Sequence, residues 1–315
     1  VYAAALENGF SPNSIILDAP FVEKQGEGLK NWKPENYGKK FYGPSTLRKG
    51  IEYSRNLMTI RIAKILGLNE ILDLSKNLEI YEEIPELLSV SLGAVETTLL
   101  NLTSAYAPFI NGGKKIRPNL ITRIQDRRGK TIFKVDNRKC SGCDKFVNQR
   151  KELPSIENLS NQVMSEETAY QMTSILSGAV KRGTAKKLKS LKVPLAGKTG
   201  TTNNNFDAWF IGFSSNLVIG VYIGFDNPKT LGKYETGSKA ALPIFKNFVE
   251  NALYKEDFKD FNIPKNIYLT SINYDTGLKS SPEDKKTILE ALKVKDINNI
   301  NNNNLISIDG RDNLI

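Results

Sequence analysis

Two short polar motifs hold the side chains best suited to chemistry: Ser54-Arg55-Asn56 and, far downstream, the six residues from Gly197 to Thr202. In the second motif Lys198 stands beside the hydroxyls of Thr199 and Thr201. A lysine flanked by hydroxyls can hold a carboxylate through charge-assisted hydrogen bonds. Taken alone, the serine and asparagine of the first motif are more typical of helix caps. The two motifs together predict a cleft that binds a carboxylate.

The sequence after Gly197 predicts a strand, which decides how the second motif is interpreted. On a strand Lys198 and Gly200 face one side, and Thr199 and Thr201 face the other. Gly200 lets an extended peptide lie close to the backbone and pair with the strand edge. A phosphate-binding loop is excluded, because Lys192 stands where that loop needs a glycine and because such a loop opens a helix.

Composition removes several other kinds of site. The 315 residues contain no histidine, which excludes Ser-His-Asp and Cys-His catalysis and any histidine-ligated metal site. Proton transfer is left to Lys, Ser, Tyr, Asp and Glu. The formal charge of +10 raises the question of nucleic acid. However, the basic runs are interrupted by apolar residues and no basic, aromatic platform is apparent, so we expect no nucleic-acid partner. We also expect no metal and no cofactor.

The elements that must position the motifs follow from periodicity. We expect helices ending at Asn8-Gly9 and running over residues 47–66, 70–78, 97–111, 165–180 and 242–253. The first fifty residues are interpreted as loop-rich, and the Ser54 motif as a break between two helices. Alternation over 115–135 predicts a β-hairpin that turns at 126–129. Three strands starting near residues 195, 208 and 217 predict an antiparallel meander.

The only two cysteines are Cys140 and Cys143, in a polar loop over residues 137–160. A zinc site needs about four ligands, and the chain has no other Cys or His to complete one. A redox motif is expected at a strand-to-helix junction. We therefore expect a tight disulfide or a surface thiol pair, with no part in the chemistry.

The second motif and its surroundings closely resemble the transpeptidase domain of class A penicillin-binding proteins, the 1A type in particular. The resemblance covers residues 1–255. It rests on residues 54–59, 178–185, 197–202, 207–213 and 224–228, and on residues 1–20, which resemble the segment that follows the family's Ser-x-x-Lys motif. It implies an α+β transpeptidase fold like that of the serine β-lactamases, with an antiparallel sheet flanked by helices.

The resemblance implies a role for each motif residue. A serine acylated by a D-Ala-D-Ala peptide would be the nucleophile, and Ser54 would relay protons for it. Asn56 would hydrogen-bond the acyl-side amide of the stem peptide. Lys198, Thr199 and Thr201 would hold the terminal carboxylate, and Thr201 N–H would donate to the oxyanion. The partners implied are peptidoglycan stem peptides and, in the complete domain, β-lactams.

The family's Ser-x-x-Lys motif does not occur in the 315 residues. We therefore expect an N-terminally truncated transpeptidase that is inactive alone, with a glycosyltransferase domain and membrane anchor as its missing partners. The resemblance places it at the periplasmic face of the bacterial inner membrane. The alternatives are a non-catalytic module that binds peptides or partner proteins, and a β-lactamase-like hydrolase, which also needs the absent serine. The expected divisions are 1–255 for the transpeptidase, 256–296 for an extension and 297–315 for an Asn-rich, disordered tail.

Overall fold

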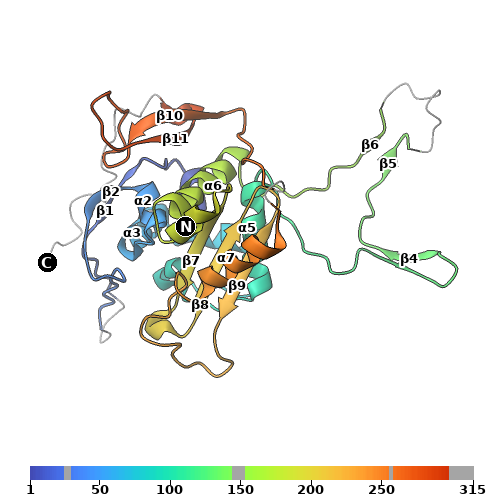
Figure 1. Cartoon of the computed structure of the whole chain (residues 1–315), viewed down its shortest axis with the longest axis horizontal. Coiled ribbons are helices and arrows are strands. Elements are labelled where there is room, and N and C mark those ends of the chain that lie inside the picture. Colours follow the sequence, from blue (N-terminus) through green and yellow to red (C-terminus); the bar gives the residue numbers. More distant parts are fainter. Residues whose placement is uncertain (25–29, 144–152, 255–257, 298–315) are drawn as a thin grey trace.

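The computed structural model describes residues 1–24, 30–143, 153–254 and 258–297. Its centre is an antiparallel sheet of three strands in the order β7-β8-β9, which is the predicted meander. The strands are β7 (Ala196–Thr201), β8 (Ala208–Phe213) and β9 (Val218–Ile223). The expected α+β architecture, an antiparallel sheet flanked by helices, is confirmed: helices cover both faces of this sheet (Figure 1).

Glycines on the sheet let helices approach both of its faces. A Cβ at Gly212 would collide with Phe245 of α7 (Ala241–Ala252). A Cβ at Gly220 would collide with Thr103 of α5 (Leu99–Ile110). Phe210 and Phe245 meet edge to face in the core under α7, with ring centroids 4.9 Å apart. Helix α6 (Glu166–Lys181) packs beside β7 and is buried along most of its length.

The predicted helices are confirmed within a few residues at each end. They are α1 (Tyr2–Glu7), α2 (Leu47–Glu52), α3 (Asn56–Leu66) and α4 (Leu68–Asn77), with short 3-10 turns at Leu88–Leu92, Lys186–Leu191 and Asn203–Asn205. Gly9 follows α1 with φ +92°, a conformation that glycine adopts most readily. Ser165 caps α6 by accepting a hydrogen bond from Thr168 N, as its sequence predicts.

The loop-rich interpretation of the first fifty residues missed one ladder. β1 (Ile15–Asp18) pairs with β2 (Gly43–Thr46), and Ile16 is completely buried between the ladder and the helices. Turn residues in both segments favoured a loop. The paired residues lie about 30 positions apart in the sequence, so no local pattern predicts their pairing.

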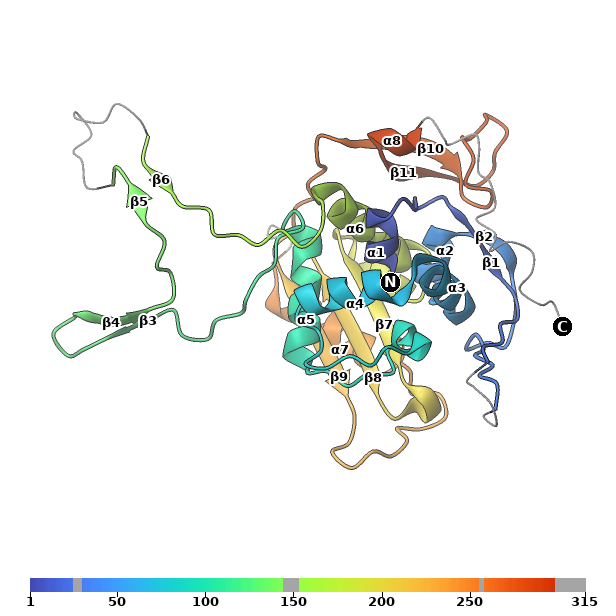
Figure 2. The same ribbon diagram turned by 180° about the vertical axis from the view of Figure 1, so that it is seen from behind.

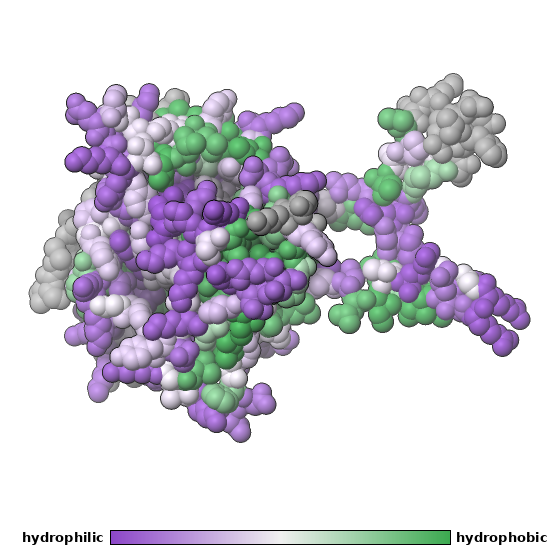
Figure 3. All heavy atoms as spheres, viewed as in Figure 1, coloured by the Kyte–Doolittle hydropathy of each residue, from purple (hydrophilic) through white to green (hydrophobic). Residues whose placement is uncertain are grey.

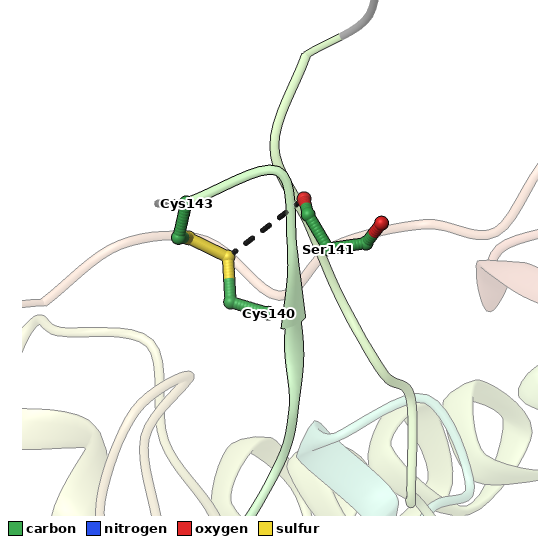
Figure 4. The surroundings of a disulfide bond; sticks show 3 residues. All are labelled: Cys140, Ser141 and Cys143. Atoms are coloured by element: carbon green, nitrogen blue, oxygen red, sulfur yellow. Dashed lines mark hydrogen bonds between the residues drawn. A yellow bond between two sulfur atoms is a disulfide. The ribbon is translucent and has the colours of Figure 1, made fainter. Parts of the chain in front are cut away.

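A long arm, described over residues 115–143 and 153–161, projects away from the body (Figures 1 and 2). It carries the predicted hairpin, β3 (Arg123–Gln125) with β4 (Thr131–Lys134), and a short pair, β5 (Cys140–Ser141) with β6 (Ser155–Ile156). Hydrophobic side chains are visible along its described surface (Figure 3). Cys140 and Cys143 form a disulfide (Figure 4), so the disulfide rather than the free thiol pair is present. Lys115 N donates to Asn161 O (2.8 Å) and closes the base of the arm.

The extension after residue 257 contains a hairpin that the sequence patterns did not predict. β10 (Ile267–Asn273) pairs with β11 (Thr287–Lys293), followed by the single turn α8 (Val294–Ile297). The hairpin β10–β11 lies over α6, α1 and α2 (Figure 2). The Asn-rich tail lies outside the described residues, apart from Ile297. Within the described ranges, no helix is long and apolar enough to cross a bilayer.

Candidate active site

Ser54 stands in a tight turn between α2 and α3, as its sequence predicts. The turn is held by Ser54 N donating to Ile51 O (3.2 Å) and Arg55 N donating to Gly50 O (2.8 Å). Ser54 itself has φ +54°, an uncommon conformation for a residue with a Cβ. Such strain is often found where a side chain must point in one direction for function.

The side chain of the neighbouring Arg55 connects this turn to the strands β1 and β2. Its guanidinium is buried and donates to Ser45 Oγ of β2 (2.7 Å), and it lies 3.7 Å from the Asp18 carboxylate of β1. The unpredicted β1–β2 ladder therefore supports the turn that presents Ser54.

The side chain of Lys198 reaches from β7 to Ser54 in this turn. Its Nζ donates to Ser54 Oγ (2.7 Å) and to Thr199 O (2.8 Å). Burial lowers the pKa of Lys198 to about 8, because desolvation disfavours the ammonium. None of the ion pairs described pairs Lys198 with a carboxylate. The two motifs, 144 residues apart, thus meet at one hydrogen bond.

The two threonines of the second motif differ in burial. Thr199 is buried, and its Oγ1 lies 3.1 Å from Thr184 Oγ1. Thr201 is exposed, and its Oγ1 accepts from Gly237 N (3.1 Å). A Cβ at Gly237 would collide with Gly200 O, so the backbone at Gly237 lies directly against β7.

Thr184 and Gly237 were not predicted as site residues. Thr184 belongs to a segment that carried the family resemblance, which was a usable signal. Gly237 lies in a loop whose neighbour in space, β7, is more than 30 residues upstream. Its contact depends on the tertiary fold, and so the sequence around it gives no indication of it.

Asn56 opens α3 and is held by the loop before β2. Its Nδ2 donates to Glu35 O (2.8 Å) in the loop before β2. The structure thus brings Ser54, Lys198, Thr199, Gly200 and Thr201 together on β7 and the turn, and fixes Asn56 at the loop side. In the parts of the chain that are described, no group of three His, Cys, Asp or Glu side chains is suited to a metal ion.

A buried ionic cluster lies one turn before Ser54. Glu52 accepts from Arg48 Nη1 (3.1 Å), from Arg182 Nη2 (2.5 Å) and from Tyr274 Oη (2.7 Å). Arg48 also forms an ion pair with Glu290 of β11. Buried charges must be paired and hydrogen-bonded to be tolerated. The cluster therefore ties α2, α6 and the extension hairpin together next to the cleft.

The chain matches a known family in sequence and in fold. The family model for the penicillin binding protein transpeptidase domain matches residues 1–250. The chain belongs to this family. Penicillin-binding protein 1A of Rickettsia felis is 43% identical over 316 residues, which cover 99% of this chain and 39% of that protein. The Pseudomonas aeruginosa protein of the same name is 32% identical, over 94% of this chain and 40% of its own length.

Solved penicillin-binding proteins share the fold. Penicillin-binding protein 1A from Haemophilus influenzae superposes with a TM-score of 0.77 at 31% identity, over 91% of this chain and 46% of that one. PonA1 from Mycobacterium tuberculosis, in complex with penicillin V, gives a TM-score of 0.65 over 84% of this chain and 69% of that one. At 19% identity that likeness shows the fold alone. The chain spans about 39% of the length of its curated relatives in Rickettsia.

Proposed function

We propose that this domain serves peptidoglycan cross-linking as a D-Ala-D-Ala transpeptidase, at the periplasmic face of the inner membrane. The observation that supports this most strongly is the hydrogen bond between Lys198 Nζ and Ser54 Oγ, at 2.7 Å. It couples a hydroxyl to an amine whose lowered pKa suits proton exchange near neutral pH. Family membership supplies the reaction class.

In this proposal the acylated serine lies outside the 315 residues, since they contain no Ser-x-x-Lys. Ser54 would pass a proton between that serine and the leaving or attacking amine, with Lys198 keeping the local charge positive. Lys198, Thr199 and Thr201 would hold the substrate carboxylate, and Thr201 N–H would donate to the oxyanion. Asn56 would contact the acyl-side amide after releasing Glu35 O.

The test is the intact mass after incubation with a β-lactam. We expect no stoichiometric adduct on the 315-residue chain. We expect one adduct on the chain extended with its own upstream sequence, on a serine of that sequence. In the extended chain, Ser54→Ala or Lys198→Ala should slow acylation by about 100-fold or more, the usual worth of proton-transfer catalysis.

Two outcomes would contradict the proposal. An adduct on Ser54 of the 315-residue chain would make Ser54 a nucleophile and not a relay. An extended chain that folds cooperatively but is never acylated would favour the second candidate, a non-catalytic module that binds peptides. Two observations support that candidate. The 315 residues contain no Ser-x-x-Lys, and they retain the carboxylate-binding residues Lys198, Thr199 and Thr201.

A further inference from the structure

The arm carries most of the net positive charge of the chain. Its described residues include nine Lys or Arg and three Asp or Glu, a net charge of +6, whereas the whole chain has +10. Glu79 of the body pairs with Lys115 and Arg117 at the base of the arm, and Asp136 pairs with Arg138. The other basic side chains of the described arm are exposed and take part in none of the ion pairs found among the described residues: Arg123, Arg127, Arg128, Lys130, Lys134 and Lys139.

The hairpin of the arm has one apolar face and one basic face. Ile124 of β3 is paired with Phe133 of β4, and paired residues of a two-stranded ribbon project from the same face. The neighbouring pair, Arg123 with Lys134, projects from the other face. Ile124 and Phe133 are 41% and 46% exposed, so the described body leaves them open to solvent. A two-stranded ribbon with an open apolar face is marginally stable in water and gains stability when a partner covers that face.

Further apolar side chains occur before and after the hairpin in the sequence. Leu120 is 100% exposed and Leu153 is 91% exposed. The turn of the hairpin is basic: it carries Arg127, Arg128 and Lys130, which we call the tip cations. Hydrophobic atoms gather along one side of the hairpin and hydrophilic atoms at its tip (Figure 3). The arm therefore presents apolar and cationic side chains to the solvent together.

This combination favours an anionic lipid bilayer over other kinds of partner. A second copy of the arm would bring like charges together. Nucleic acid would require aromatic rings on which bases stack, and Phe133 is the sole aromatic residue of the described arm. A protein partner would bury a contiguous apolar core that is depleted of lysine, whereas here basic residues lie among the apolar ones. At a bilayer surface, apolar side chains enter the boundary below the headgroups while lysine and arginine stay with the lipid phosphates.

We propose that the arm is a peripheral membrane-binding element that docks on an anionic lipid surface. Ile124 and Phe133 enter the boundary of the acyl chains, and the tip cations contact the lipid phosphates. The arm joins the body at its base, where Lys115 N donates to Asn161 O (2.8 Å), so the body can stay clear of the lipid. The proposal does not rest on the transpeptidase reaction, and such a contact needs no membrane-spanning helix.

The experiment measures co-sedimentation of the 315-residue chain with lipid vesicles, at low and at high salt. One set of vesicles contains equimolar phosphatidylglycerol and phosphatidylcholine, and the other contains phosphatidylcholine alone. We expect the chain to bind the anionic vesicles, and to bind the neutral ones at least about tenfold more weakly. High salt should reduce this difference, because it screens exposed charges.

The charge of the tip is tested with Arg127→Gln/Arg128→Gln/Lys130→Gln. This variant should bind the anionic vesicles about tenfold more weakly or less, because each cation near the surface adds to the attraction. The matched control is Lys186→Gln/Lys187→Gln/Lys189→Gln, which removes the same charge from exposed positions of a turn packed on the body and should leave binding unchanged. A further variant, Arg127→Lys/Arg128→Lys, keeps the charge and should keep the binding.

The apolar face is tested with Ile124→Thr/Phe133→Thr, since threonine keeps the strand preference and removes most of the apolar surface. We expect binding to the anionic vesicles to weaken about tenfold. The matched control is Ile244→Gln/Phe248→Gln on α7, where the same residue types are 51% and 46% exposed. It should leave binding unchanged. Urea unfolding of each variant should give the midpoint of the unaltered chain, because the altered arm residues lie outside the packed body.

A depth measurement separates insertion from attraction at the surface alone. Phe133→Trp adds a fluorophore to the apolar face, and phosphatidylcholine brominated on its acyl chains should quench it beyond the quenching of Trp32 and Trp209 in the unaltered chain. Phe248→Trp should show no such increase.

Four results would each overturn the proposal. They are equal binding of neutral and anionic vesicles, the absence of binding to either, equal binding by the tip variant and the unaltered chain, and the absence of extra quenching in Phe133→Trp. Weaker binding of the tip variant with unchanged binding of the Thr variant would also overturn it, since the arm would then attract polyanions in general, nucleic acid included.

Discussion

At the residue scale, the contact between Ser54 and Lys198 requires two features that are each unfavourable in free energy. Ser54 adopts a left-handed backbone conformation, and Lys198 carries its amine into a desolvated place. Motif spacing predicted that the two would share a cleft. It did not predict the φ of Ser54, because a serine does not signal that conformation. Nor did it predict Thr184 as the partner of Thr199.

Lys198 makes stability depend on pH in a defined direction. Its pKa in the folded chain is about 8, below its ordinary value of 10.5, so between these values the unfolded chain binds more protons. The free energy of unfolding should therefore rise as pH increases from about 8 to 10.5, by at most about 3 kcal/mol, and stay level with respect to this group below pH 8.

Urea unfolding at a series of pH values measures this effect. Lys198→Met should remove the rise between pH 8 and 10.5 and make the chain more stable at pH 7 than the unaltered one. The exposed Lys76 of α4 offers the control, Lys76→Met, which should leave the slope in place. An identical pH profile for Lys198→Met and the unaltered chain would show that the amine is not desolvated.

At the element scale, the predictions succeeded where a pattern is local and failed where pairing is distant. The helix α6 has a capping serine, two glutamates in its first turn and an apolar face, all within residues 165–181. The strands β10 and β11 have partly exposed faces. A polar connection of 13 residues links the end of β10 to the start of β11. Their position is set instead by buried polar contacts: Lys293 Nζ donates to Leu6 O (2.8 Å) and Gln171 Nε2 donates to Ala291 O (3.0 Å).

The extension hairpin should contribute to the stability of the whole domain. Glu290→Ala removes the carboxylate that pairs with the fully buried Arg48 and leaves part of that charge uncompensated. We expect a loss of about 3 kcal/mol in the free energy of unfolding, the usual range for breaking a buried pair. Urea denaturation checks it.

The matched control for that variant is Glu283→Ala, an exposed glutamate in the turn of the same hairpin, which should change stability by less than about 0.5 kcal/mol. A double variant, Arg48→Met/Glu290→Leu, should recover much of the loss, because it removes both charges. Equal, small effects of Glu290→Ala and Glu283→Ala would mean that the hairpin does not stabilise the core.

At the scale of the whole molecule, the arm separates the two motifs in sequence but not in space. Ser54 comes before the arm, between α2 and α3, and Lys198 comes after it, in β7. These three elements belong to the body (Figures 1 and 2). The described arm residues make few contacts with the body beyond its base, where Gln162 Nε2 donates to Gly112 O (2.7 Å). The chain is thus one packed body with an appended arm.

Limited proteolysis should act on the arm first, because an exposed backbone away from a packed core is the preferred site of cleavage. We expect trypsin to cut near Arg127 and Arg128, both exposed in the turn of the hairpin. The two products should elute together from a sizing column and separate only in denaturant. Initial cleavage inside α2 or α6, or products that separate under native conditions, would contradict this account of the arm.

The ionic cluster at Glu52 also joins the segments that flank Ser54 and Thr199. Thr184 N donates to Glu52 O (3.0 Å), while the Glu52 carboxylate binds Arg48, Arg182 and Tyr274. The strand-side wall of the cleft and the serine turn are thereby joined through one residue that also secures the extension. The amide of Thr184 should then exchange its hydrogen with solvent only when the whole domain opens. The walls of the cleft would be among the last parts of the molecule to loosen, so substrates would enter a preformed cleft.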